Sequence, residues 1–144
     1  MPKTLEKIAL FLAKHHLLSL ATCAENRPHS ASLFYAYDEK NIAFVVASDF
    51  KTEHIKNVIL NTNVSGTVAL ETDEVGKIQG LQFRAKISEA GEDAEKIYYK
   101  AFPYAKVMQP KLWSIRLEQL KFTDNRLGFG KKLYWNRADF KEFE

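Results

Sequence analysis

Four polar side chains that can bind an anion gather within seven residues of the chain, at Ser48, Lys51, Thr52 and His54. They stand between a continuous apolar run and the start of an amphipathic pattern, which predicts a strand-to-helix turn. The first N–H groups of a helix lack intrahelical partners, and the helix dipole adds positive charge at that end. Two hydroxyls, an ammonium and an imidazole at such a turn predict a phosphate-binding site.

A simpler interpretation of this turn stays open. Thr52 is a good N-cap residue, because its hydroxyl can accept a hydrogen bond from the first turn of the helix. Lys51 is then an ordinary solvated lysine, and no ligand is needed to explain either residue. Spacing alone does not decide between a phosphate site and a capped helix.

The elements that position this turn follow from hydrophobic periodicity. The apolar run Ile42–Ala47 predicts a buried strand, and a helix from Thr52 to about Leu60 buries Ile55, Val58 and Ile59. Two more strands with four-residue turns precede them, which together predict an antiparallel meander. These two strands are Leu17–Cys23, apolar enough to be buried on both faces, and His29–Tyr37.

The rest of the chain adds helices and long strands. Period-2 alternation in Lys77–Ser88 leaves Gln82, Arg84 and Lys86 on a face that is wet or functional. Gly66 is a candidate for a bulge or a close approach, and the apolar phase slips near Glu118-Gln119, which indicates a β-bulge. The remaining predictions are helices over 2–14 and Glu92–Phe102, an irregular Tyr104–Pro110, and strands Val64–Glu71, Leu112–Thr123 and Lys132–Asn136.

This order of elements predicts a mainly β (α+β) fold. Antiparallel hairpins without βαβ alternation favour a barrel of six to seven strands with about three peripheral helices. The 144 residues, 46% hydrophobic and 27% charged, fit a single globular domain over 1–144. One cysteine, Cys23, and no apolar run long enough for a membrane span lead us to expect a cytoplasmic protein.

Several other functions find little support. The four histidines and Cys23 lack the short spacings of a metal site. Gly128–Lys132 superficially looks like a phosphate loop, but it lacks the required spacing, so a structural glycine turn is favoured. A charge of +3 is too small and too evenly spread to indicate nucleic acid or membrane partners, and no RNA-binding aromatic spacing is present.

Short motifs across residues 5–135 carry a family resemblance. In order and spacing they resemble the pyridoxamine 5′-phosphate oxidase-like FMN-binding split-barrel superfamily. The closing run Thr123–Trp135 looks like an uncharacterised bacterial subgroup, the YhbP-like proteins. The other motifs are Arg27-Pro28-His29-Ser30-Ala31-Ser32, Tyr37–Lys40, Ile42–Ser48 and Lys51–His54.

The resemblance implies a split β-barrel that forms a homodimer with two FMN sites at the subunit interface. By position, Ser48, Lys51 and Thr52 match the phosphate turn, and His54 matches it more weakly. The second-strand segment that passes the flavin ring corresponds to Ser30, Ala31 and Ser32, and the end of the third strand beside it to Ala47. The side chains implied to reach in from the partner subunit are those of Gln79, Gln82 and Trp113.

The chain also departs from the oxidases themselves. Ala31 stands where they carry a phosphate-binding arginine, Lys51-Thr52 replaces their Arg-Lys pair, and their C-terminal Arg-x-His segment is missing. These differences argue against oxidation of pyridoxamine phosphate. Three functions remain open: an FMN-dependent redox protein with an unknown substrate, a non-catalytic flavin or haem storage protein, and a dimeric interaction module without a cofactor.

Overall fold

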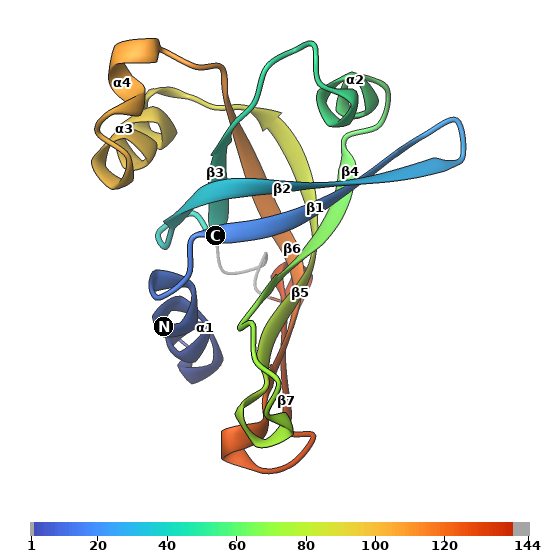
Figure 1. Cartoon of the computed structure of the whole chain (residues 1–144), viewed down its shortest axis with the longest axis vertical. Coiled ribbons are helices and arrows are strands. Elements are labelled where there is room, and N and C mark those ends of the chain that lie inside the picture. Colours follow the sequence, from blue (N-terminus) through green and yellow to red (C-terminus); the bar gives the residue numbers. More distant parts are fainter. Residues whose placement is uncertain (1, 140–144) are drawn as a thin grey trace.

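The computed structural model describes residues 2–139, and within this range the chain forms four α-helices and seven strands. Two short 3₁₀ turns, η1 (Val75–Lys77) and η2 (Asn125–Leu127), lie at hairpin ends (Figure 1). The helices are α1 (Lys3–Ala13), α2 (Glu53–Leu60), α3 (Glu92–Ala101) and α4 (Ala105–Met108). The strands are β1 (Leu17–Ala24), β2 (Arg27–Asp38), β3 (Ala43–Ala47), β4 (Asn63–Ala69), β5 (Gln79–Glu89), β6 (Leu112–Asp124) and β7 (Lys132–Asn136).

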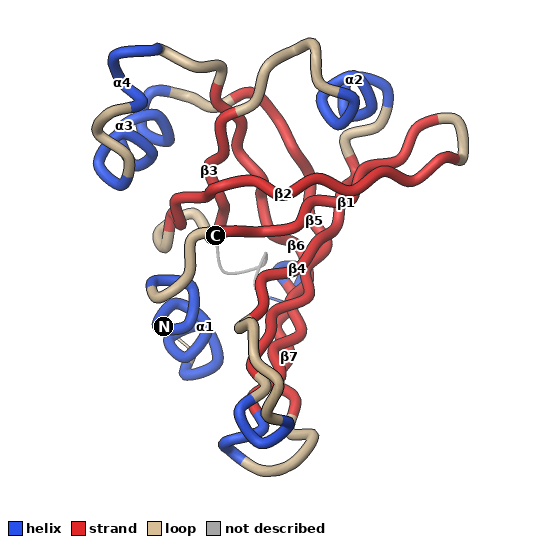
Figure 2. Tube along the Cα trace, in the orientation of Figure 1, coloured by secondary structure: helices blue, strands red, loops and turns tan. Residues whose placement is uncertain are grey.

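The described strands form one antiparallel sheet that closes on itself. Their order is β3-β2-β1-β4-β5-β6-β7, and β3 pairs with β6 as well as with β2. The pairing of β3 with β6 closes a six-stranded barrel, while β7 extends the sheet beyond it (Figure 2). The predicted mainly β barrel of six to seven antiparallel strands is therefore confirmed.

The sequence pattern does not predict helix α4. Tyr104–Pro110 is predicted as irregular, which is wrong for α4, a single turn that ends at Gln109 with φ 46°. Tyr104, Val107 and Met108 are 91%, 88% and 83% exposed, so α4 has no buried face to produce a periodic signal. No helix within residues 2–139 combines the length and the apolar character needed to cross a membrane.

The barrel interior and a second, smaller core explain why strands differ in burial. Helix α1 covers one end of the barrel and packs Phe11 against Phe122, with ring centroids 5.1 Å apart. Helix α3 covers the outer face of β3, where Val45 and Tyr98 belong to one apolar cluster. Because β3 has apolar neighbours on both faces, its sequence is a continuous apolar run.

Strand β1 and helix α2 each correct one prediction. No helix of residues 2–139 covers the outer face of β1, so the strand alternates, with Leu18 and Leu20 buried and Ser19 and Ala21 half-buried. Ile59 of α2, predicted to be buried, is 63% exposed. The buried face of α2 is instead formed by two apolar and two polar side chains, and the Asn57 amide donates to Thr22 Oγ1 at 3.1 Å.

Two local irregularities are confirmed. Ala85 lies opposite Leu117 and Arg84 opposite Gln119, so Glu118 is the extra residue of a β-bulge in β6. At Gly66, a Cβ atom would lie 2.2 Å from the Ser19 carbonyl oxygen. The backbones of β1 and β4 can approach this closely only because the residue is glycine.

Candidate functional site

The predicted anion residues meet where β3 ends and α2 begins. Ser48 Oγ lies 2.5 Å from His54 Nε2 and 3.5 Å from Thr52 Oγ1. The Thr52 hydroxyl donates to the Asp49 carbonyl oxygen at 2.8 Å and accepts from the Ile55 N–H at 3.4 Å. Thr52 is thus the N-cap that the simpler interpretation predicts, and it also contributes a hydroxyl to a cluster of three polar side chains.

This turn offers a phosphate more hydrogen-bonding groups than positive charges. The Lys51 side chain is exposed, and its ammonium has no ion pair within residues 2–139. The N–H groups of Glu53 and His54 have no acceptor in the same part of the chain. Asp49 Oδ1 accepts from the Lys51 N–H at 2.8 Å, which adds a carboxylate beside the site. One ammonium and two N–H groups are therefore available to an anion, whereas the Ser48 and Thr52 hydroxyls beside them are engaged within the turn.

His54 holds Ser48 in place and adds no charge to the turn. Its ring is only 7% exposed and stacks on that of His29, with centroids 6.4 Å apart. Burial, and then the nearby His29, lowers the pKa of His54 below its ordinary value of 6.5. The imidazole is therefore neutral at pH 7, and its Nε2 is engaged by the Ser48 hydroxyl.

This lowered pKa predicts how folding stability depends on pH. Between pH 6.5 and the lower pKa of folded His54, the unfolded chain binds the proton more readily, so the free energy of unfolding falls as the pH falls. We expect His54→Gln to make this acid-side loss smaller, measured by urea unfolding at pH 7.5 and 5.5. Part of the loss will persist, because burial also lowers the pKa of His15. An unchanged pH dependence in the variant would contradict this assignment.

Trp113 supports the turn from within its own chain. Its side chain is 5% exposed, and its indole N–H donates to the Ser48 carbonyl oxygen at 2.9 Å. The rings of Trp113 and Phe50 meet edge-on, with centroids 5.5 Å apart. The Lys111 ammonium lies 5.5 Å from one ring and 5.6 Å from the other. These contacts hold the loop between β3 and α2 in place.

The other predicted residues lie on three strands, β2, β3 and β5. Gln79 is the first residue of β5, next to the η1 turn, and its Oε1 accepts from Arg126 Nη2 at 3.0 Å. On β2, Ser30 and Ser32 are exposed and lie on the outer face, while Ala31 is half-buried opposite Leu20. Half-buried Ala47 ends β3. Gln82 is exposed on the outer face of β5.

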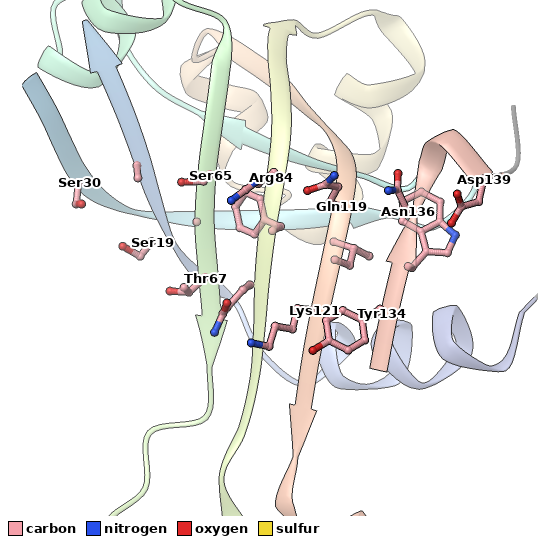
Figure 3. A pocket seen from close by; sticks show the side chains of 16 residues that line it. Ser19, Ser30, Ser65, Thr67, Arg84, Gln119, Lys121, Tyr134, Asn136 and Asp139 are labelled. Carbon is pink, nitrogen blue, oxygen red and sulfur yellow. The ribbon is translucent and has the colours of Figure 1, made fainter. Parts of the chain in front are cut away.

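A groove that no sequence motif indicated brings Ser30 and Gln82 together. It occupies about 780 Å³ on the outer face of the sheet, over β1, β2, β4, β5, β6 and β7 (Figure 3). Two rows of side chains line the groove. Each row runs across the strands, and each strand that it crosses contributes one side chain. One row is Ser19, Thr67, Gln82, Lys121 and Tyr134; the other is Ser30, Ala21, Ser65, Arg84, Gln119 and Asn136.

The only sequence signal for this groove is the alternation in β5, which places Gln82 and Arg84 on one face. The other lining residues come from strands that are distant in sequence, and their meeting depends on the register of the sheet. The residues between the two rows, such as Leu20 and Phe83, point into the barrel and are buried.

Comparison with other proteins adds the family. No protein-family model matches the chain. The UPF0306 protein YhbP of Salmonella arizonae is 39% identical over 138 residues, which cover 93% of this chain and 94% of that protein. A UPF0306 protein of Citrobacter koseri is 36% identical over 143 residues, covering 96% of this chain and 98% of that one.

Solved structures share the fold at low sequence identity. A haem-binding protein from Mycobacterium smegmatis superposes with a TM-score of 0.78 at 16% identity, and covers 97% of this chain while this chain spans 60% of it. The haem storage protein HutZ from Vibrio cholerae gives 0.65 at 19% identity, over 80% of this chain and 91% of HutZ. An FAD-binding protein from Mesorhizobium loti gives 0.67 at 15% identity, over 80% and 88%.

The structural likenesses concern the barrel fold. The identity to the Salmonella and Citrobacter proteins extends over nearly the whole length of both chains. The chain therefore belongs to the UPF0306 (YhbP) family of bacterial proteins, and its fold is the split barrel of the pyridoxamine 5′-phosphate oxidase-like proteins.

Proposed function

We propose that this protein binds FMN and takes part in a redox reaction. The observation that carries the proposal is the turn at the start of α2. There the Ser48 and Thr52 hydroxyls lie 3.5 Å apart, and the same turn carries the exposed Lys51 and two N–H groups without an acceptor among the described residues. Neighbours of the same fold that are named as FAD-binding or haem-binding support a planar cofactor.

In this proposal, the residues of the chain bind and orient the cofactor. FMN, when bound, supplies the transfer of hydride or electrons. Lys51, Thr52 and the first N–H groups of α2 hold its phosphate, while His54 fixes the rotamer of Ser48. The small side chains of Ser30, Ala31, Ser32 and Ala47 let the ring pass close to the backbone of β2 and the end of β3.

We also propose that the protein is a cytoplasmic homodimer whose two sites lie between subunits. The outer face of β1 supports this arrangement, because no helix of the described residues covers it. The resemblance implies Gln79, Gln82 and Trp113 as partner side chains. We keep Gln79 and Gln82 in this role, because Trp113 is buried against Ser48 of its own chain. The second candidate function is non-catalytic flavin or haem storage on the same barrel. It is favoured by the named functions of the haem-binding and haem storage neighbours.

The first test is a cofactor titration. The purified protein is examined for flavin absorbance, and the cofactor-free protein is titrated with FMN, riboflavin and haemin while its thermal midpoint is followed. We expect FMN to raise the midpoint and riboflavin to raise it less, because riboflavin lacks the phosphate. No flavin absorbance and no shift with FMN would overturn the proposal.

Two further outcomes separate the candidate functions. A shift with haemin alone would favour haem storage. FMN binding without oxidation of a reduced nicotinamide would favour flavin storage, whereas turnover supports the redox role. Sedimentation velocity of the same sample tests the homodimer.

A further inference from the structure

A cavity of about 400 Å³ is bordered by helices α1 and α3 and by the last residues of strand β2. It shares no lining residue with the turn at α2 or with the groove on the outer face of the sheet, and α1 and α3 lie on the same side of the barrel (Figure 1). Its volume lies in the usual range for small-molecule sites. The apolar part of its lining consists of Ala9, Leu12, Ala13, Ala36, Ala101 and Phe102.

Two hydrogen bonds fix the end of α1 against β2 at this cavity. The Tyr35 hydroxyl donates to the carbonyl oxygen of Leu12 at 2.7 Å, and the Tyr35 N–H donates to the carbonyl oxygen of His16 at 2.9 Å. The His15 ring packs on that of Phe11, with centroids 4.4 Å apart. The wall formed by α1 and β2 is therefore held in place before any ligand binds, which lowers the entropic cost of binding.

The polar side chains of the lining can accept hydrogen bonds. The Glu39 carboxylate is exposed at the edge of the cavity. The half-buried Tyr37 has no hydrogen-bond partner for its hydroxyl within residues 2–139, and burial raises its pKa to about 12, so the group stays neutral. Burial, and then the nearby His16 and Lys14, lowers the pKa of His15, whose imidazole is therefore neutral at pH 7.

Two helices also end at the cavity. Ala13 and Ala101, the last residues of α1 and α3, both line it. The C-terminus of a helix carries partial negative charge and carbonyl groups without intrahelical partners. Neither of these two carbonyl oxygens accepts a hydrogen bond from the described residues. Lys14 and Lys100, the lysines next to the helix ends, are not among the lining residues, so the cavity has negative groups and no lysine or arginine in its wall.

We propose that this cavity binds a small organic cation, a primary amine carried on an apolar group. An ammonium has three donors and no acceptor, which matches a carboxylate, a phenol oxygen and the carbonyl groups of two helix ends. Glu39 and Tyr37 accept from the ammonium, and the apolar group of the ligand packs on Leu12 and Phe102. The proposal rests on residues outside the FMN site and does not require that FMN binds.

Phenethylamine and phenethyl alcohol are a matched pair of probes, because they differ only in the amine and the hydroxyl. The amine is protonated at pH 7. Each probe is titrated into the ¹⁵N-labelled protein, and the amide signals of Ala13, His15, Glu39 and Ala101 are followed in ¹H–¹⁵N NMR spectra. We expect the amine to shift these signals and to bind about tenfold more tightly than the alcohol, because hydrogen bonds to a charged group are stronger.

Substitutions then assign this preference to residues. Glu39→Gln is expected to weaken amine binding about fivefold and to leave the alcohol unchanged, because Glu39 is exposed and the helix ends stay in place. Glu25→Gln is the matched control, since Glu25 is an exposed glutamate in the turn between β1 and β2, outside the cavity. Ala101→Leu places a larger side chain in the wall and is expected to weaken both probes roughly tenfold. Ala101 is exposed, and the thermal midpoint of the variant reports whether the fold is kept.

Three results would overturn the proposal. The first is that neither probe shifts the signals of these four residues. The second is that the alcohol binds as tightly as the amine, which would make the cavity apolar without a preference for cations. The third is that Glu39→Gln and Ala101→Leu both bind the amine as tightly as the unaltered protein, which would place the amine elsewhere. FMN titrations of the same variants are expected to be unchanged, so this proposal and that of FMN binding can fail independently.

Discussion

Simultaneous replacement of Lys51 and Thr52 by alanine is expected to weaken FMN binding more than tenfold. The double variant removes the ammonium and one of the two hydroxyls at the start of α2. A hydrogen bond to a charged group contributes about 1.5–3 kcal/mol, so the loss of two such contacts exceeds the free energy of a tenfold change. Isothermal titration calorimetry of the cofactor-free protein measures the effect.

Two controls separate phosphate binding from helix capping. Lys56→Ala removes an exposed cation one turn further along α2 and should leave FMN affinity unchanged. Riboflavin affinity should change little in the double variant, because riboflavin lacks the phosphate. The lost N-cap lowers the free energy of unfolding by about 1 kcal/mol, which urea unfolding reports separately. An FMN dissociation constant unchanged by the double substitution would refute this placement of the phosphate.

Gly66→Ala is expected to cost about 3 kcal/mol of folding stability. The new methyl group would lie 2.2 Å from the Ser19 carbonyl oxygen and 2.5 Å from the end of the Phe83 ring. The carbonyl belongs to the pairing of β1 with β4, so it cannot move away without breaking the ladder. The Phe83 ring is 3% exposed and packed in the barrel, which limits its movement as well. Urea unfolding measures the loss.

Gly76→Ala is the matched control for this substitution. Its Cβ atom would meet nothing within 4 Å, and Gly76 lies in the exposed η1 turn. We expect its free energy of unfolding to match that of the unaltered protein. If Gly66→Ala were as stable as Gly76→Ala, the two strands would have to separate more easily than the packing of the barrel implies.

The sequence predicts most elements of this fold because their signals are local. The alternation in β5, the apolar run of β3 and the phase slip at Glu118 each require only neighbouring residues. Ile42 shows where this fails: it continues the apolar run, but its φ of 52° ends the turn before the strand begins at Ala43. Nothing in the identity of an isoleucine predicts that conformation, which β-branched residues rarely adopt.

The two candidate sites differ in how far sequence reasoning reaches. The turn at α2 is contiguous, so its residues and the cap at Thr52 follow from spacing. The hydrogen bond from Trp113 to Ser48 does not follow from spacing, because these residues meet only through the pairing of β3 with β6. The groove is even harder to predict from the sequence. Arg84 and Lys121 become neighbours through a register that includes a bulge, and no local pattern fixes such a register.

That bulge also determines where the length of the chain can change. Glu118 is the residue of β6 without a partner in β5, so its deletion would leave Leu117 opposite Ala85 and Gln119 opposite Arg84. Every other side chain of the strand would keep its face. Deletion in a regular part of the strand, at Ile115 for instance, would exchange buried and exposed positions. Single-residue gaps between family members are therefore expected to fall at Glu118.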